Sequence, residues 1–133
     1  MGKQTVEKDR RLLSDWLDSV GRLVEDVKSW AQASRWSIHE DEKEIREAPF
    51  GIYRAPWLRI GTPNGEIRVE PVARFTAGPA DGRVDLEAWP SLNRVMLLRK
   101  DDSWLIMTDS GVPIRQAWNR DTFVQLTKDL LAA

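Results

Sequence analysis

Two apolar runs separated by a polar turn lie between residues 94 and 107 (RVMLLRKDDSWLIM). Val95–Leu98 and Trp104–Met107 are the runs, and Lys100–Ser103 lies between them, which is the pattern of a β-hairpin. Neither run alternates apolar and polar residues, as a strand with one solvated face would. The pattern therefore predicts a central hairpin that is covered on both faces.

The N-terminal part of the chain, about Thr5–Ala33, has the period of an amphipathic helix. Its apolar stripe comprises Val6, Leu13, Trp16, Leu17, Val20, Val24, Val27 and Ala31. At 1.5 Å per residue this helix is about 40 Å long, whereas a compact chain of this size has a radius of gyration of about 14 Å. We therefore expect it to cross the whole domain or to project beyond it, and its first turns are candidates for contact with a second subunit.

Five more segments have the pattern of extended strands. They are Arg35–Asp41, Tyr53–Ile60, Glu66–Phe75, Arg83–Trp89 and a short last piece, Ile114–Trp118. The acidic run at residues 39–44 is expected to be a solvated strand end or loop. Pro56 cannot donate to a ladder, so an edge position or a bulge is expected there. Asn64-Gly65 predicts a type I′ turn between two of the strands.

The C-terminal segment from about Arg120 to Leu131 predicts a second helix, with Asn119 as its N-cap. Trp118 and Phe123 stand at the spacing of a hydrophobic staple across that cap. Phe123 would then belong to the buried stripe of the helix.

These elements together predict one α+β domain over residues 1–133. The helices occupy about residues 5–33 and 120–131, and an antiparallel, mostly meandering sheet of five to seven strands occupies about residues 35–118. We expect the first helix against one sheet face, and the second against the other face or at one end. The alternative is a pleckstrin-homology-like barrel, because many short strands followed by one capping helix is the element order of that fold, an analogy that carries no function.

The composition narrows the class of protein. The chain has 133 residues, a formal net charge of −1, and no cysteine. A disulfide framework and a thiolate metal site are therefore excluded, and a strong overall attraction to nucleic acid or anionic lipid is not expected. The N-terminus lacks the apolar stretch of a signal peptide, and no window approaches the roughly 18 apolar residues of a membrane span. We expect a soluble cytoplasmic protein that does not bind a membrane.

Few residues are available for catalysis. His39 is the single histidine, and the eight glycines form neither a Walker loop nor a dinucleotide fingerprint. Asp85 and Glu87 stand on one strand face, as carboxylates of metal-dependent hydrolases do, but no lysine is near them in sequence. We interpret the pair as a solvated strand face, and predict no catalytic residue, no metal site and no cofactor.

Arginine and tryptophan are the more informative residue types. Residues 51–100 carry eight basic and five acidic side chains, and the whole chain has seven tryptophans. Arginines interleaved with Trp57 and Trp89 have the chemistry to hold phosphates and stack bases. Cross-strand pairing with glutamate on a solvated sheet explains the same arginines.

The favoured function is a small non-enzymatic protein-interaction module, such as an adaptor, a chaperone-like protein or a toxin-neutralising protein. It would bind another protein, and a homodimer is a further candidate assembly. Single-stranded nucleic-acid binding through the sheet arginines and tryptophans is the alternative, and a metal-dependent hydrolase using Asp85 and Glu87 is the third hypothesis. The candidate binding residues are Trp89, Asp85, Glu87 and Arg83 on one strand, with Trp57 and Arg59 beyond it.

Overall fold

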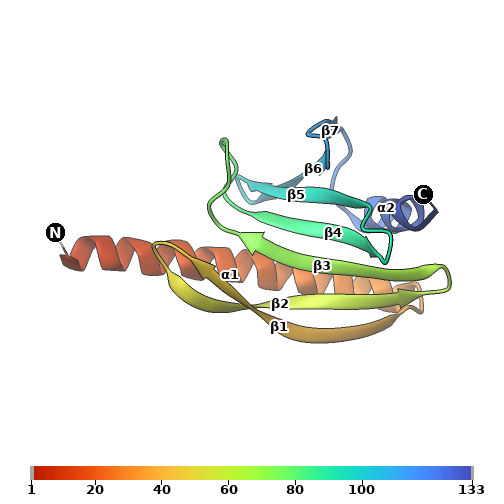
Figure 1. Cartoon of the computed structure of the whole chain (residues 1–133), viewed down its shortest axis with the longest axis horizontal. Helices are drawn as coiled ribbons and strands as arrows, with labels where there is room; N and C mark the ends of the chain where they lie inside the picture. The colour runs from red at the N-terminus through yellow and green to blue at the C-terminus, as the bar shows by residue number, and fades with distance from the viewer. Residues whose placement is uncertain (1, 133) are drawn as a thin grey trace.

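The computed structural model describes residues 2–132 (Figure 1). In sequence order it has a helix, seven strands that form one antiparallel sheet, and a second helix. The helices are α1 (Gly2–Ala33) and α2 (Arg120–Ala132). The strands are β1 (Ser37–Glu47), β2 (Gly51–Thr62), β3 (Gly65–Ala73), β4 (Arg83–Trp89), β5 (Arg94–Lys100), β6 (Ser103–Thr108) and β7 (Pro113–Ile114). Each strand pairs with the next one in sequence, and β1 and β7 form the two edges. The α+β meander is confirmed, and the barrel alternative is wrong because the sheet is open.

Both helices pack on the same face of the sheet, which lies in front of them in Figure 1. On α1, Trp16, Val20 and Val27 are fully buried in the core. On α2, Phe123 is fully buried, and its ring centroid lies 5.8 Å from that of Trp30 on α1. Of the two positions expected for α2, the opposite sheet face is therefore wrong. It packs beside the C-terminal part of α1, at the end of the sheet where it contacts β3 and β4.

The central hairpin β5–β6 is covered on one face only. Val95, Leu97 and Ile106 are buried under the helices, but Leu105 on the opposite face is 49% exposed. The predicted cover on both faces is wrong. An uninterrupted apolar run does not distinguish a strand buried on both sides from a strand with an apolar outer surface, and here the second case holds.

The long N-terminal helix extends past the sheet, as its predicted length required (Figure 1). Val6, in its second turn, is 48% exposed, and of residues 5–33 of α1 Trp16 is the first that is fully buried. Contact of the projecting turns with a second subunit stays a prediction.

The acidic run at residues 39–44 lies inside β1, which pairs with β2 along its entire length. The expectation of a strand end or loop there is wrong, because backbone pairing with β2 continues through exposed acidic side chains. Pro56 lies where β2 has only β1 beside it, since the pairing of β2 with β3 begins at Leu58. The edge position predicted for this proline is confirmed.

The β2–β3 connection is a tight hairpin of different geometry from the one predicted. Thr62 pairs with Gly65, so Pro63 and Asn64 are the central residues, and of these turn residues only Gly65 has a positive φ, 139°. A type I′ turn on Asn64-Gly65 is therefore wrong, because Pro63 moves the turn back by one residue.

The β5–β6 connection has the type I′ backbone that the sequence predicted for the β2–β3 connection. Its two central residues, Asp101 and Asp102, have φ values of 48° and 63°, as a type I′ turn requires. The polar turn predicted at Lys100–Ser103 is confirmed.

The start of α2 follows its sequence pattern closely. The side-chain oxygen of Asn119 accepts a hydrogen bond from the backbone N–H of Thr122 at 3.0 Å. The rings of Trp118 and Phe123 lie 5.9 Å apart between centroids, so both the predicted cap and the predicted staple are confirmed.

Candidate binding face of the sheet

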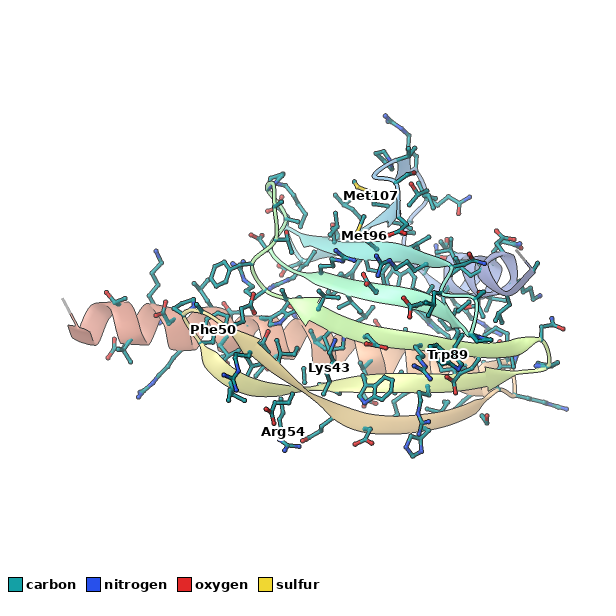
Figure 2. All side chains as sticks on the ribbon, viewed as in Figure 1. Lys43, Phe50, Arg54, Trp89, Met96 and Met107 are labelled. Carbon is teal, nitrogen blue, oxygen red and sulfur yellow. The ribbon has the colours of Figure 1, made fainter. Side chains whose placement is uncertain are left out.

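All six candidate binding residues lie on the sheet face turned away from α1 and α2, here called the open face. On β4 the alternation decides this, because Val84, Leu86 and Ala88 are fully buried in the core and the residues between them point the other way. Figure 2 shows Trp89 with Lys43 over the lower strands, and Met96 with Met107 over the upper ones. The structure thus brings together residues that the sequence could place only strand by strand.

Two arginines and two tryptophans form one group on β2, β3 and β4, called here the Arg–Trp cluster: Trp57, Arg59, Arg68 and Trp89. The guanidinium carbon of Arg68 lies 4.1 Å from the ring centroid of Trp89 and 5.9 Å from that of Trp57. The guanidinium carbon of Arg59 lies 5.7 Å from the Trp57 ring. Each of these distances is in the range of a cation–π contact.

Arg68 was not among the predicted binding residues, although it is the centre of this cluster. It pairs directly with Arg59 across β2 and β3, and with Glu87 across β3 and β4. The sequence shows only that Arg68 alternates with buried Ile67 and Val69. Its position between the two tryptophans depends on the hairpin register.

Asp85 is the centre of a second group, in which carboxylates and arginines pair. Arg83 donates two hydrogen bonds to Asp85, at 2.8 and 3.0 Å, and Nη1 of Arg94 lies 3.6 Å from the same carboxylate. The side chain of Asp85 is only 10% exposed. The expected solvated position is therefore wrong for Asp85, because long arginine side chains pack against it on the open face.

Glu87 extends this group toward the Arg–Trp cluster. Its carboxylate lies 3.8 Å from Nη1 of Arg94, and Nε of the same arginine donates a hydrogen bond to Asp109 at 2.8 Å. Partial burial raises the pKa of Glu87, the nearby carboxylate of Glu70 raises it further, and Arg94 partly offsets both effects. Glu87 therefore holds its negative charge at a cost in folded-state stability.

The open face becomes apolar toward β5 and β6. Met96 pairs with Met107, and Leu98 pairs with Leu105, which places these four side chains next to one another. We call them the apolar strip. Leu105 is exposed, and the other three are half-buried. The sequence prediction assigned these residues to the core, because their spacing alone does not show that a second covering layer is missing.

Metal chemistry finds little support in the described part of the chain. Among residues 2–132 no group of three or more His, Cys, Asp or Glu side chains is placed to hold a metal ion. Asp85 and Glu87 instead face the arginines described above, and His39 is exposed on the edge strand β1.

A cleft of about 500 Å³ lies between α1, the start of β6 and the segment before α2, and Leu105 of the apolar strip is among its lining residues. Leu23, Trp104 and Trp118 form its apolar wall, and Arg99, which also lines it, is paired with Asp102 at 3.1 Å. This cleft is a second surface on which a ligand could be sought.

Neither α1 nor α2, over residues 2–132, contains an apolar stretch sufficient to cross a membrane. Comparison of the chain with protein-family models, with curated proteins and with solved structures gave no significant match.

Proposed function

We propose that this protein is a small non-enzymatic interaction module that docks a partner protein on its open face. The observation that carries this proposal is the combination found there. Both helices pack on the other face, and the open face presents the Arg–Trp cluster next to the apolar strip. Tryptophan, arginine and methionine are enriched in the centres of protein interfaces, where a few such residues supply most of the binding energy.

The two halves of the open face suit different parts of one interface. The apolar strip offers surface whose removal from water favours association, and methionine side chains adapt to irregular partners. The arginines and carboxylates next to it supply directional contacts that fix the orientation of the partner. A catalytic role would need groups left free for chemistry, and Asp85 is instead held by arginines.

The proposal is tested by site-specific photo-crosslinking in the cells that express the protein. A photoreactive amino acid replaces Leu105 on the apolar strip, and in control proteins it replaces Glu25 on the solvent side of α1 or Gln116, an exposed residue that lines the cleft. We expect a discrete protein adduct from position 105 that is absent from position 25. We also expect Trp89→Ala to weaken that adduct.

Other results would overturn the proposal or identify a different partner. An adduct from position 25 or 116 without one from position 105 would overturn the proposal, as would no adduct from 105. Adducts from both 105 and 116 would place the partner at the cleft instead of on the open face. An adduct of two copies of the 15.3 kDa chain would make the partner a second copy of this protein. Binding of single-stranded oligonucleotide that weakens steeply with salt would support the nucleic-acid alternative instead.

A further inference from the structure

Arg59 differs from the other arginines of the sheet region. Between residues 51 and 100, six of the seven arginines have a carboxylate within 4 Å: Arg54, Arg68, Arg74, Arg83, Arg94 and Arg99. Among the described residues no carboxylate lies within 4 Å of the Arg59 guanidinium group, and its Nε is buried without a hydrogen-bond acceptor. Burying a guanidinium nitrogen without an acceptor costs folding free energy. An anion bound at the Arg59 guanidinium group would therefore be favourable.

The position of Arg68 makes an anion at Arg59 still more favourable. Arg68 stands directly opposite it across β2 and β3, and like charges in this position repel each other. Both guanidinium groups lie near the ring of Trp57. Glu66 accepts from Nε of Arg68 at 2.7 Å, and Glu87, directly opposite on β4, also attracts Arg68. Both carboxylates therefore act on Arg68, and Arg59 is the arginine of the cluster that has no carboxylate within 4 Å among the described residues.

We propose that the Arg–Trp cluster is a receptor for a single carboxylate, carried by an acidic side chain of the protein that docks on the open face. This inference rests on the function proposed above and specifies the chemistry of the partner. The carboxylate would accept hydrogen bonds from Arg59 and from the free end of Arg68. Trp57 and Trp89 would flank it and reduce its contact with water, which strengthens such charged pairs.

The surroundings favour one carboxylate over a polyanion. Glu66, Glu70 and Glu87 border the cluster on β3 and β4. A nucleic-acid strand that placed one phosphate at Arg59 would bring its neighbouring phosphates toward these acidic side chains. A protein segment carries its negative charge at one position and avoids that repulsion.

The apolar strip adds a distance to this description. Arg68 on β3 and Met96 on β5 are two strands apart and offset by two residues along the strands, because Arg68 aligns with Glu87 and Met96 with Asp85. At the usual strand spacing and rise this is about 12 Å. The acidic residue of the partner should therefore lie about 12 Å from an apolar side chain, which is roughly two turns of a helix.

The test uses the ¹⁵N-labelled full chain and two matched probes, N-acetyl-glutamate N-methylamide and N-acetyl-glutamine N-methylamide. In NMR titrations we expect the glutamate probe to shift the Nε–H signal of Arg59 and the indole N–H signals of Trp57 and Trp89 in a saturable way. The glutamine probe, which differs only in lacking the charge, should leave them in place. Arg59→Gln should weaken binding of the glutamate probe by about tenfold, the loss of one charge-assisted hydrogen bond.

Arg54→Gln is the matched control, because it makes the same change on the same strand at an exposed arginine away from the cluster (Figure 2). It should bind the glutamate probe as the unchanged chain does. Equal shifts with both probes, no shift with either, or equal weakening by Arg59→Gln and Arg54→Gln would overturn the carboxylate receptor. Oligo(dT) binding at Arg59 more tightly than the glutamate probe would replace it with a nucleic-acid site.

The crosslinking experiment at Leu105 does not depend on this result. An adduct from position 105 that Arg59→Gln leaves unchanged would remove the carboxylate receptor and keep the docking face. Loss of the adduct in Trp89→Ala and in Arg59→Gln alike would support both proposals.

Discussion

Trp89 lies with its ring centroid 4.1 Å from the guanidinium carbon of Arg68, and the residue is nevertheless 44% exposed. Trp16, on the covered face of the sheet, is fully buried in the core. The two tryptophans thus have different environments. The face of the sheet on which each one lies decides whether it is exposed or buried.

Trp89→Ala should leave the melting temperature nearly unchanged, because it removes an exposed ring and one cation–π contact worth about 0.5–1 kcal/mol. Trp16→Ala should lower the free energy of unfolding by about 3–5 kcal/mol, since it empties a packed core position. Thermal and urea unfolding of the two variants measure this difference. A large loss of stability in Trp89→Ala would assign that ring a structural role instead.

Glu87→Gln should stabilise the protein at pH 7. The folded-state pKa of Glu87 is raised, so its charged form is disfavoured by folding, and its contribution is favourable only when the pH is low enough to protonate it. The stability advantage of the variant should therefore disappear as the pH falls below the ordinary pKa of glutamate, about 4.3. Urea unfolding of both proteins between pH 3.5 and pH 7 measures this trend, and an advantage that grows toward low pH would contradict it.

Asp85→Ala should destabilise the fold by about 3 kcal/mol, because it leaves Arg83 and Arg94 without the nearly buried carboxylate between them. Asp109→Ala is the control, since it also removes a partner of Arg94, at 2.8 Å, but from an exposed position. It should cost at most about 1 kcal/mol. Similar losses in the two variants would mean that burial of Asp85 does not govern its contribution.

Removal of residues 1–8 should shift the melting temperature by no more than a few degrees. Residues 5–8 are exposed, and among residues 5–33 the fully buried side chains of α1 begin at Trp16. Light scattering on the full chain and on the truncated chain tests the predicted contact with a second subunit. A mass of two copies of the 15.3 kDa chain that falls to one copy on truncation would place a homodimer interface on the projecting turns.

Asn119→Ala should lower the free energy of unfolding by about 1 kcal/mol, because the backbone N–H of Thr122 loses its acceptor at the start of α2. Asn119→Asp keeps an acceptor oxygen at this position and should retain most of the stability. Chemical unfolding of the two variants separates loss of the cap from a general effect of changing the residue.

Local sequence patterns by themselves determined the type and the order of the helices and strands of this protein. The α1 stripe, the alternation in β4 and the Asn119 cap each depend on residues a few positions apart, so their signals are complete within one segment. The alternation in β4 also placed Asp85, Glu87 and Trp89 on one side of the strand with Arg83. Arg59 and Trp57 could be proposed as binding residues, but not as neighbours of Arg68.

The tertiary structure alone decided which face stays open and which residues meet there. Two helices and one sheet face form a single core, and a strand's own pattern does not record whether its second face is covered. Register was decided in the same way. A turn centred on Asn64-Gly65 would have placed Arg59 opposite Glu70, whereas the observed turn on Pro63-Asn64 places it opposite Arg68. Pairing register depends on the turn that the whole sheet accommodates, and here it creates the unpaired positive charge of the Arg–Trp cluster.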